Sequence, residues 1–126
     1  MGVEEENEHV VRSLLAALSE HDTEALRGFL TDDVVYHNIP MDPAVGIDAS
    51  LAFLESFFGM FESIAVENLH VATRGDAVLT ERIDTMSMGG AVAPLPVMGT
   101  FELRDGKVSA WRDYFDLAQV TQMLGG

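Results

Sequence analysis

The chain has 126 residues, 48% of them hydrophobic, which predicts one domain spanning residues 1–126 and large enough to bury a core. Its 21 acidic and 7 basic residues give a formal net charge of −14, which disfavours nucleic acid, anionic membranes and highly charged anionic substrates as partners. There is no cysteine, so disulfides, thiolate metal sites and a cysteine nucleophile are excluded. Neither a secretory leader nor a long apolar span stands out, so we expect a cytoplasmic protein. The negative charge fits a neutral, apolar ligand, although general solubility is the simpler explanation of the acidity.

The first half of the chain has mostly helical periodicity. Residues 5–20 predict an amphipathic helix, and Asp22 can cap a second helix after it. A strand over residues 34–39 ends at the proline-bounded loop 40–43, and an unusually apolar helix over residues 48–61 is expected to pack on a sheet. The side chains expected to face inward from the first two helices are Val10, Val11, Leu14, Leu15, Leu18, Leu26, Phe29 and Leu30.

The second half changes to strand-like patterns separated by glycine-containing turns. The predicted strands cover residues 64–73, 77–88, 91–103 and 108–115, and a short helix over 117–124 follows them. Pro94 and Pro96 should restrict one strand to edge pairing or mark a bulge. Helices followed by a meander predict an α+β fold, in which a curved mixed or antiparallel sheet forms a cone with helices on one side. An apolar pocket inside such a cone suits a small hydrophobic ligand.

Five polar side chains do not fit this apolar interior. Tyr36 and Asn38 share one strand face, Arg82 and Asp84 share another, and Asp113 lies between two aromatic residues on the last strand. Each has an ordinary explanation. The Arg82 pair could face solvent with Leu79 and Ile83 as the core side, the Tyr36 pair could simply have backbone partners, and Asp113 could pair with a base or cap the next helix.

Together, the five residues allow a different interpretation. A buried arginine with two carboxylates can be satisfied, whereas any one of these groups buried alone would be costly. If Arg82 lies between Asp84 and Asp113, desolvation and repulsion favour one acid keeping its proton. Two carboxyl groups in unlike protonation states form a general acid and base pair.

The stretches VVYHNIP, ERID and WRDYFD, taken together, resemble limonene-1,2-epoxide hydrolases, within the SnoaL-like and NTF2-like superfamily. The resemblance extends over essentially the whole chain, in element order and in motif order. It implies an NTF2-like fold and an enzyme that adds water to a hydrophobic epoxide, terpenoid, steroid or lipid-derived, to give a vicinal diol. It also implies that no metal or organic cofactor is required, and that the protein is a homodimer.

The resemblance also implies a role for each motif residue. Tyr36 and Asn38 would hold a water molecule, and Asp113 would accept its proton as it attacks the epoxide. Arg82 would bridge the acids, and Asp84 would donate a proton to the epoxide oxygen. Acid and base acting together each contribute roughly 10²–10⁴-fold to such a reaction.

Two other functions remain open from the sequence. A ketosteroid-isomerase-like or polyketide-cyclase-like enzyme would use an aspartate to remove a carbon-bound proton, although enolate chemistry has no obvious use for the Arg82 bridge. A passive binding module would not need the five polar groups to converge. The four histidines are spread over separate elements, with His37 on the opposite strand face from Tyr36, so a metal site is not predicted.

Overall fold

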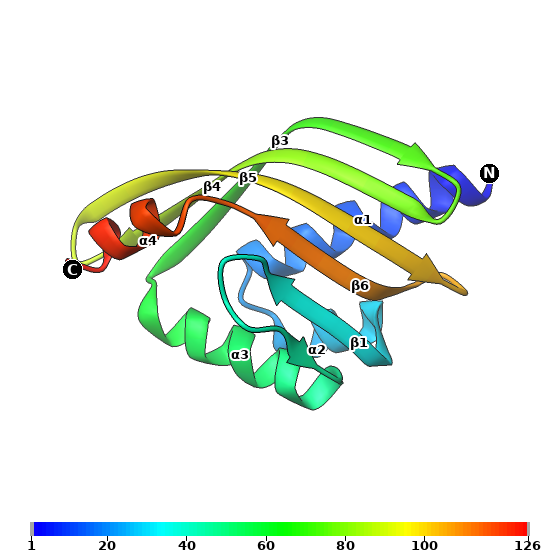
Figure 1. Cartoon of the computed structure of the whole chain (residues 1–126), viewed down its shortest axis with the longest axis horizontal. Coiled ribbons are helices and arrows are strands. Elements are labelled where there is room, and N and C mark those ends of the chain that lie inside the picture. The colour runs from blue at the N-terminus through cyan, green and yellow to red at the C-terminus, as the bar shows by residue number, and fades with distance from the viewer. Residues whose placement is uncertain (1, 126) are drawn as a thin grey trace.

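The computed structural model describes residues 2–125, in which four helices lie on one face of a six-stranded mixed sheet (Figure 1). The strand order is β2-β1-β6-β5-β4-β3, and every neighbouring pair is antiparallel except β1 with β6, which is parallel. The sheet arches over the helices without closing on itself, so the predicted α+β class and one-sided cone are confirmed. The strands are β1 (Leu30–Asn38), β2 (Ala44–Val45), β3 (Ser63–Arg74), β4 (Ala77–Met88), β5 (Ala91–Arg104) and β6 (Lys107–Tyr114).

The helices form where the apolar periodicity predicts them. Asp22 caps the second helix by accepting a hydrogen bond from the Ala25 backbone N–H at 3.1 Å, as its position predicts. Asp116 caps the last helix in the same way through Ala118, so the cap there is Asp116 and not Asp113. The helices are α1 (Val3–Ser19), α2 (Thr23–Phe29), α3 (Ile47–Met60) and α4 (Leu117–Met123).

The strands differ from prediction mainly around β1. The first strand begins at Leu30, four residues earlier than expected, because the chain passes from α2 directly into the sheet. Leu30 is therefore a buried strand residue rather than part of a helix face. The two-residue β2 was not predicted, since its only structural signature is the pairing of Ala44 and Val45 with β1.

Pro94 and Pro96 lie on a part of β5 that pairs with one neighbour only. Strand β5 pairs with β4 along its length, but its pairing with β6 begins at Met98. The prolines therefore face a locally free edge, where a missing N–H breaks no ladder. The β4 pairing continues without a register shift, so edge pairing was the correct expectation and a bulge was not.

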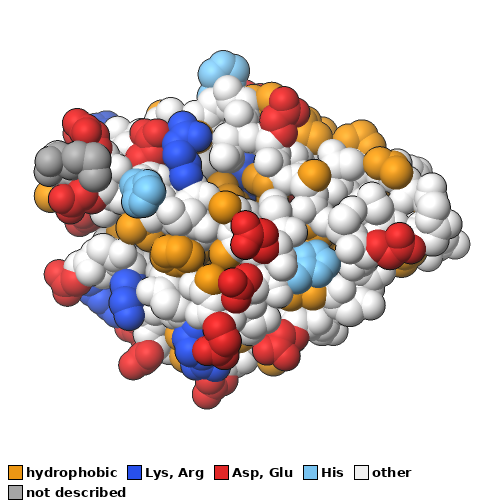
Figure 2. Space-filling model, turned by 180° about the vertical axis from the view of Figure 1, so that it is seen from behind, with side chains coloured by type: hydrophobic (Ala, Val, Ile, Leu, Met, Phe, Trp, Pro, Cys, Tyr) orange, Lys and Arg blue, Asp and Glu red, His pale blue; other side chains and the backbone are white. Residues whose placement is uncertain are grey.

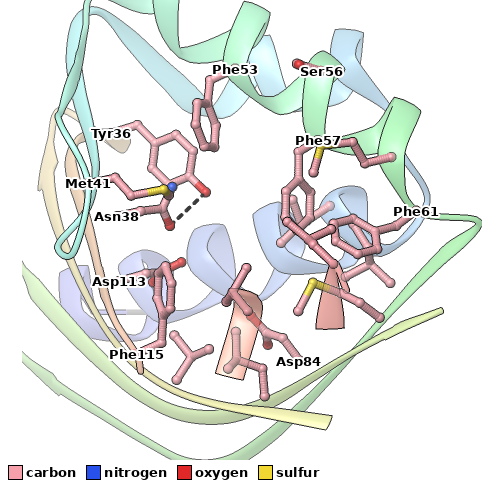
Figure 3. A pocket seen from close by; sticks show the side chains of 18 residues that line it. Tyr36, Asn38, Met41, Phe53, Ser56, Phe57, Phe61, Asp84, Asp113 and Phe115 are labelled. Carbon is pink, nitrogen blue, oxygen red and sulfur yellow. Dashed lines mark hydrogen bonds between the residues drawn. The ribbon is translucent and has the colours of Figure 1, made fainter. Parts of the chain in front are cut away.

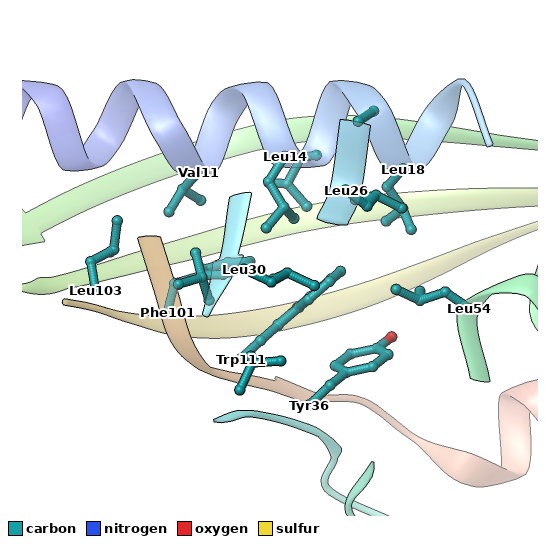
Figure 4. Packing of buried hydrophobic residues seen from close by; sticks show 14 of the residues in the cluster. Val11, Leu14, Leu18, Leu26, Leu30, Tyr36, Leu54, Phe101, Leu103 and Trp111 are labelled. Atoms are coloured by element: carbon teal, nitrogen blue, oxygen red, sulfur yellow. The ribbon is translucent and has the colours of Figure 1, made fainter. Parts of the chain in front are cut away.

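The core lies between the helices and the concave face of the sheet (Figure 4). Trp111 is fully buried at its centre, 4.2 Å from the Tyr36 ring and 5.5 Å from the Phe101 ring between centroids. A second cluster, which includes Phe61, Ile64 and Leu95, lies around the end of the sheet nearest α4. Burial of the aromatic side chains thus fixes β1, β5 and β6 relative to one another.

The surface reflects the acidic composition. Figure 2, which views the molecule from behind, shows acidic side chains scattered over this face with few basic ones among them. Within residues 2–125, no helix combines the length and the apolar character that crossing a bilayer would require.

Candidate active site

Strand β4 directs its charged residues into the molecule. Its even-numbered side chains from Val78 to Met86 are buried, including Arg82 at 0% and Asp84 at 8% relative exposure. Leu79, which the solvent-facing interpretation placed in the core, is 42% exposed. That interpretation is therefore wrong, and a full positive charge lies inside the concave face of the sheet.

Arg82 holds both acids with its guanidinium group. Nε and Nη2 donate to Asp84 Oδ1 and Oδ2 at 3.1 and 2.8 Å, and Nη1 and Nη2 donate to Asp113 Oδ1 and Oδ2 at 3.1 Å each. A fifth hydrogen bond, also 3.1 Å, runs from Nη1 to the Thr80 hydroxyl. All five N–H donors of the arginine are thus used, which makes its complete burial tolerable.

The parallel pairing of β1 with β6 brings the second polar pair to the same place. Asn38 is the register partner of Asp113, and Tyr36 is the partner of Trp111. The Tyr36 hydroxyl donates to Asn38 Oδ1 at 3.4 Å. This is longer than a usual O–H···O hydrogen bond, so both groups keep most of their capacity for another partner.

Four of the five predicted residues line an apolar cavity of about 240 Å³ (Figure 3). Asn38 and Asp113 lie on one side of it and Asp84 on another, and the rest of the labelled wall is largely aromatic. Arg82 lies behind the two acids and does not line this cavity. The cavity residues are Leu18, Tyr36, Asn38, Met41, Phe53, Ser56, Phe57, Met60, Phe61, Ile64, Asp84, Met86, Leu95, Val97, Asp113, Phe115, Val120 and Leu124.

The pKa of one acid in the site, Asp84, is raised above its ordinary value. Burial raises the pKa of the Asp84 carboxyl, and the hydrogen bonds and charge of Arg82 oppose this rise without cancelling it. Burial alone would lower the pKa of Arg82, but Asp113 and Asp84 outweigh it, so the guanidinium stays charged. Burial, together with the charge of Asp113, also raises the pKa of the Tyr36 phenol, which keeps its proton. Burial therefore favours the protonated form of the Asp84 carboxyl.

Sequence reasoning missed two residues that contact this cluster, Thr80 and Gly99. Gly99 lies directly against Arg82 and Asp113. Its signal was a glycine on the buried face of a strand, a position that often marks a close approach of other groups. His37, by contrast, contacts the Met41 carbonyl at 2.9 Å and does not line the cavity. Across residues 2–125, no three histidine, aspartate or glutamate side chains gather in an arrangement that could hold a metal ion.

The open sheet, the helices on one face and the apolar cavity between them define a protein of the SnoaL-like fold class. A SnoaL-like protein from Jannaschia sp. CCS1 superposes with a TM-score of 0.87 at 22% identity, covering 97% of this chain and 93% of its own. At that identity the likeness shows the fold alone. An LEH-like epoxide hydrolase from M. tuberculosis gives a TM-score of 0.86 at 30% identity, covering 96% of this chain and 90% of its own.

The sequence comparisons narrow the class to one family. The limonene-1,2-epoxide hydrolase catalytic domain matches residues 5–124. The epoxide hydrolase EphG of Mycobacterium tuberculosis (strain ATCC 25618 / H37Rv) is 34% identical over 107 residues, which are 85% of this chain and 71% of that protein. The chain therefore belongs to the limonene-1,2-epoxide hydrolase family and is an epoxide-hydrolase-like enzyme.

Proposed function

We propose that this protein adds water to a hydrophobic epoxide in one step, giving a vicinal diol without a metal or organic cofactor. The observation that carries the proposal is the Arg82 bridge, which holds two buried carboxyl groups at the wall of an apolar cavity. A site for enolate chemistry has no need of such a bridge, and a passive pocket has no need of the buried charges. Family membership independently favours the same reaction.

Tyr36, Asn38 and Asp113 form the water side of the proposed site. The long contact between the phenol and the amide leaves each able to bind a water molecule, and Asp113 is the register neighbour of Asn38. In this proposal Asp113 takes one proton from the water as the water oxygen bonds to an epoxide carbon. A fixed water next to a base reacts much faster than one arriving from bulk solvent.

Asp84 supplies the proton that the opening ring requires. As the carbon–oxygen bond breaks, the epoxide oxygen takes the bond electrons and accepts the Asp84 proton, so no free alkoxide forms. The raised pKa of this carboxyl keeps it protonated at a pH where an exposed aspartate would be ionised. The product carries one hydroxyl from water and one from the epoxide. The proton gained by Asp113 must then return to Asp84 before the next turnover.

The size of the cavity favours a small substrate. Its volume of about 240 Å³ is slightly below the roughly 300–1,000 Å³ of drug-sized pockets. Among terpenoid, steroid and lipid-derived epoxides, we therefore expect small terpenoid or short-chain epoxides to be turned over faster than steroid epoxides. A panel of these three kinds of epoxide, compared by kcat/KM, tests this order.

Single-turnover hydrolysis in water enriched in the heavy oxygen isotope tests the mechanism. With protein in excess over an apolar epoxide, direct attack by water gives a labelled diol in the first turnover. An unlabelled diol in that turnover would instead mean that a carboxylate attacked first, and the proposed role of Asp113 would be wrong. Absence of diol with every epoxide in the panel would contradict the proposed function.

We also infer that the partner is a second copy of the chain, as membership of the family implies. The outer face of the sheet is left uncovered by the helices and exposes apolar side chains on adjacent strands. These are Leu69, Leu79, Met98 and Tyr114. Light scattering after gel filtration should give twice the chain mass, and Met98→Glu should shift the protein toward a monomer. A monomeric wild type at micromolar concentration would contradict the inference.

A further inference from the structure

Arg82 reaches across an intervening strand to hold Asp113. The arginine is on β4 and Asp113 is on β6, and β5 lies between them. Adjacent strands are about 4.8 Å apart, so the guanidinium must pass over the β5 backbone to reach an acid two strands away. The register gives the crossing point, because Gly99 of β5 pairs with Thr80 on one side and with Asp113 on the other.

Gly99 leaves the space through which the guanidinium passes. A Cβ atom built on this residue would lie 2.4 Å from Arg82 Nη1, 2.6 Å from Asp113 Oδ1 and 2.9 Å from Thr80 Oγ1. All three distances are shorter than real Cβ contacts allow. Gly99 is not among the glycines with positive φ, so its backbone conformation would accept alanine. The need for glycine here is one of space and not of backbone freedom.

Thr80 holds Nη1 of Arg82, the guanidinium nitrogen that lies against Gly99. Its hydroxyl is buried, accepts the hydrogen bond from Arg82 Nη1 at 3.1 Å and donates to the Gly99 carbonyl at 3.3 Å. The donated bond to Gly99 orients the oxygen lone pairs of Thr80 toward Nη1. The Thr80 oxygen thus accepts the one guanidinium hydrogen bond that neither acid accepts.

We propose that Thr80 and Gly99 are positioning residues, which set the guanidinium of Arg82 where it can hold Asp84 and Asp113 at once. This inference rests on the proposed epoxide hydrolysis for its catalytic meaning. Neither residue lines the cavity, so neither contributes to substrate binding directly. Groups that act in catalysis need placement within about 0.5 Å, and misplacement by 1 Å can cost roughly 100-fold in rate.

The Thr80 hydroxyl is tested by two variants that differ only in that group or in one methyl. Thr80→Val keeps the shape of the side chain but removes the acceptor, and we expect kcat to fall about 10-fold with KM within about twofold of wild type. Thr80→Ser keeps the hydroxyl and should restore most of the kcat. If the role of Thr80 were purely structural, Thr80→Ser would instead have the lower kcat of the two variants, because serine loses buried volume.

The space at Gly99 is tested against a matched glycine. Gly99→Ala should lower kcat roughly 100-fold, because the new methyl displaces Nη1 and Asp113 Oδ1. Gly28→Ala in α2 is the control, since its Cβ would have nothing within 4 Å, and it should keep wild-type kcat and gain slightly in stability. If Gly99→Ala fails to fold, the comparison of Thr80→Val with Thr80→Ser tests the inference by itself.

Crystal structures separate this inference from the proposed function. In Gly99→Ala and Thr80→Val we expect Arg82 to lose at least one of its two bonds to Asp113. Retention of all the acid contacts in both variants would overturn the inference, whatever the activity of the wild type. Wild-type kcat in both variants, in a protein that does hydrolyse epoxides, would overturn it as well. A wild type that forms no diol would refute the proposed function alone.

Discussion

Replacing Arg82 with methionine should destabilise the protein by an amount that depends on pH. Methionine fills a similar volume but removes all five hydrogen bonds from two acids that are only 8% and 5% exposed. Removing one partner of a buried ion pair typically costs about 3–5 kcal/mol. A domain of this kind has about 5–15 kcal/mol in total, so the variant should still fold.

The pH dependence follows from the pKa of Asp84. Burial raises that pKa and Arg82 opposes the rise, so removing Arg82 raises the pKa further. A carboxyl whose folded-state pKa lies above its unfolded value of about 4 supports folding at low pH, and this support is lost as pH rises through the folded-state pKa. The cost of Arg82→Met should therefore be smaller at about pH 5 than at about pH 8, where it should approach about 3–5 kcal/mol.

Urea unfolding at both pH values measures this difference, with the single tryptophan, Trp111, as the fluorescent probe. Arg12→Met is the control, because the Arg12 pair with Glu8 is exposed on α1 and should cost about 0–1 kcal/mol at either pH. Equal destabilisation of the Arg82 variant at the two pH values would refute the reasoning, as would a loss no larger than that of the control.

Four further results are expected. Asp113→Asn and Asp84→Asn should each lower the rate of diol formation by roughly 10²–10⁴-fold, and wild-type turnover in either would remove that residue from the mechanism. The rate in the wild type should fall as pH rises through the raised pKa of Asp84, because its proton is lost, and a pH–kcat profile with no fall toward high pH would contradict Asp84 as the acid. Tyr36→Phe should reduce kcat and leave KM nearly unchanged in steady-state assays, since the ring can remain against Trp111 while the hydroxyl is lost; a change confined to KM would argue for a binding role. Trp111→Ala should lower the unfolding free energy by about 3–5 kcal/mol in calorimetry, and a loss below 1 kcal/mol would be inconsistent with its place in the core.

The order of helices and strands could be predicted from the sequence because periodicity is a local property. β4 was predicted with the bounds that it has, since turns at residues 74–76 and 89–90 delimit a strand-like run over residues 77–88. The short β2 and the early start of β1 could not be found in this way, because both depend on pairing with other strands. The parallel pairing of β1 with β6 likewise joins segments more than 70 residues apart.

The candidate site was predictable to the extent that its residues look out of place. Arg82 and Asp113 are conspicuous because charges on a buried face need partners. Thr80 and Gly99 are not conspicuous, since a threonine and a glycine in strands raise no question until the register of three strands is known. The pattern of residue types therefore indicated the charged groups of the candidate site, while the groups that hold them in place depend on tertiary structure.

The uneven pairing of β5 divides the site into two mechanically different parts. The segment from Met98 to Arg104 is paired with a strand on each side and carries Gly99, over which Arg82 reaches Asp113. The segment before it is bonded on one side only, and it contributes Leu95 and Val97 to the cavity wall. Leu95 is also the register partner of Asp84, whereas Asp113 pairs with Asn38 on one side and Gly99 on the other. Changes at Leu95 can thus remodel the cavity wall beside Asp84 while Asp113 keeps its pairing on both sides.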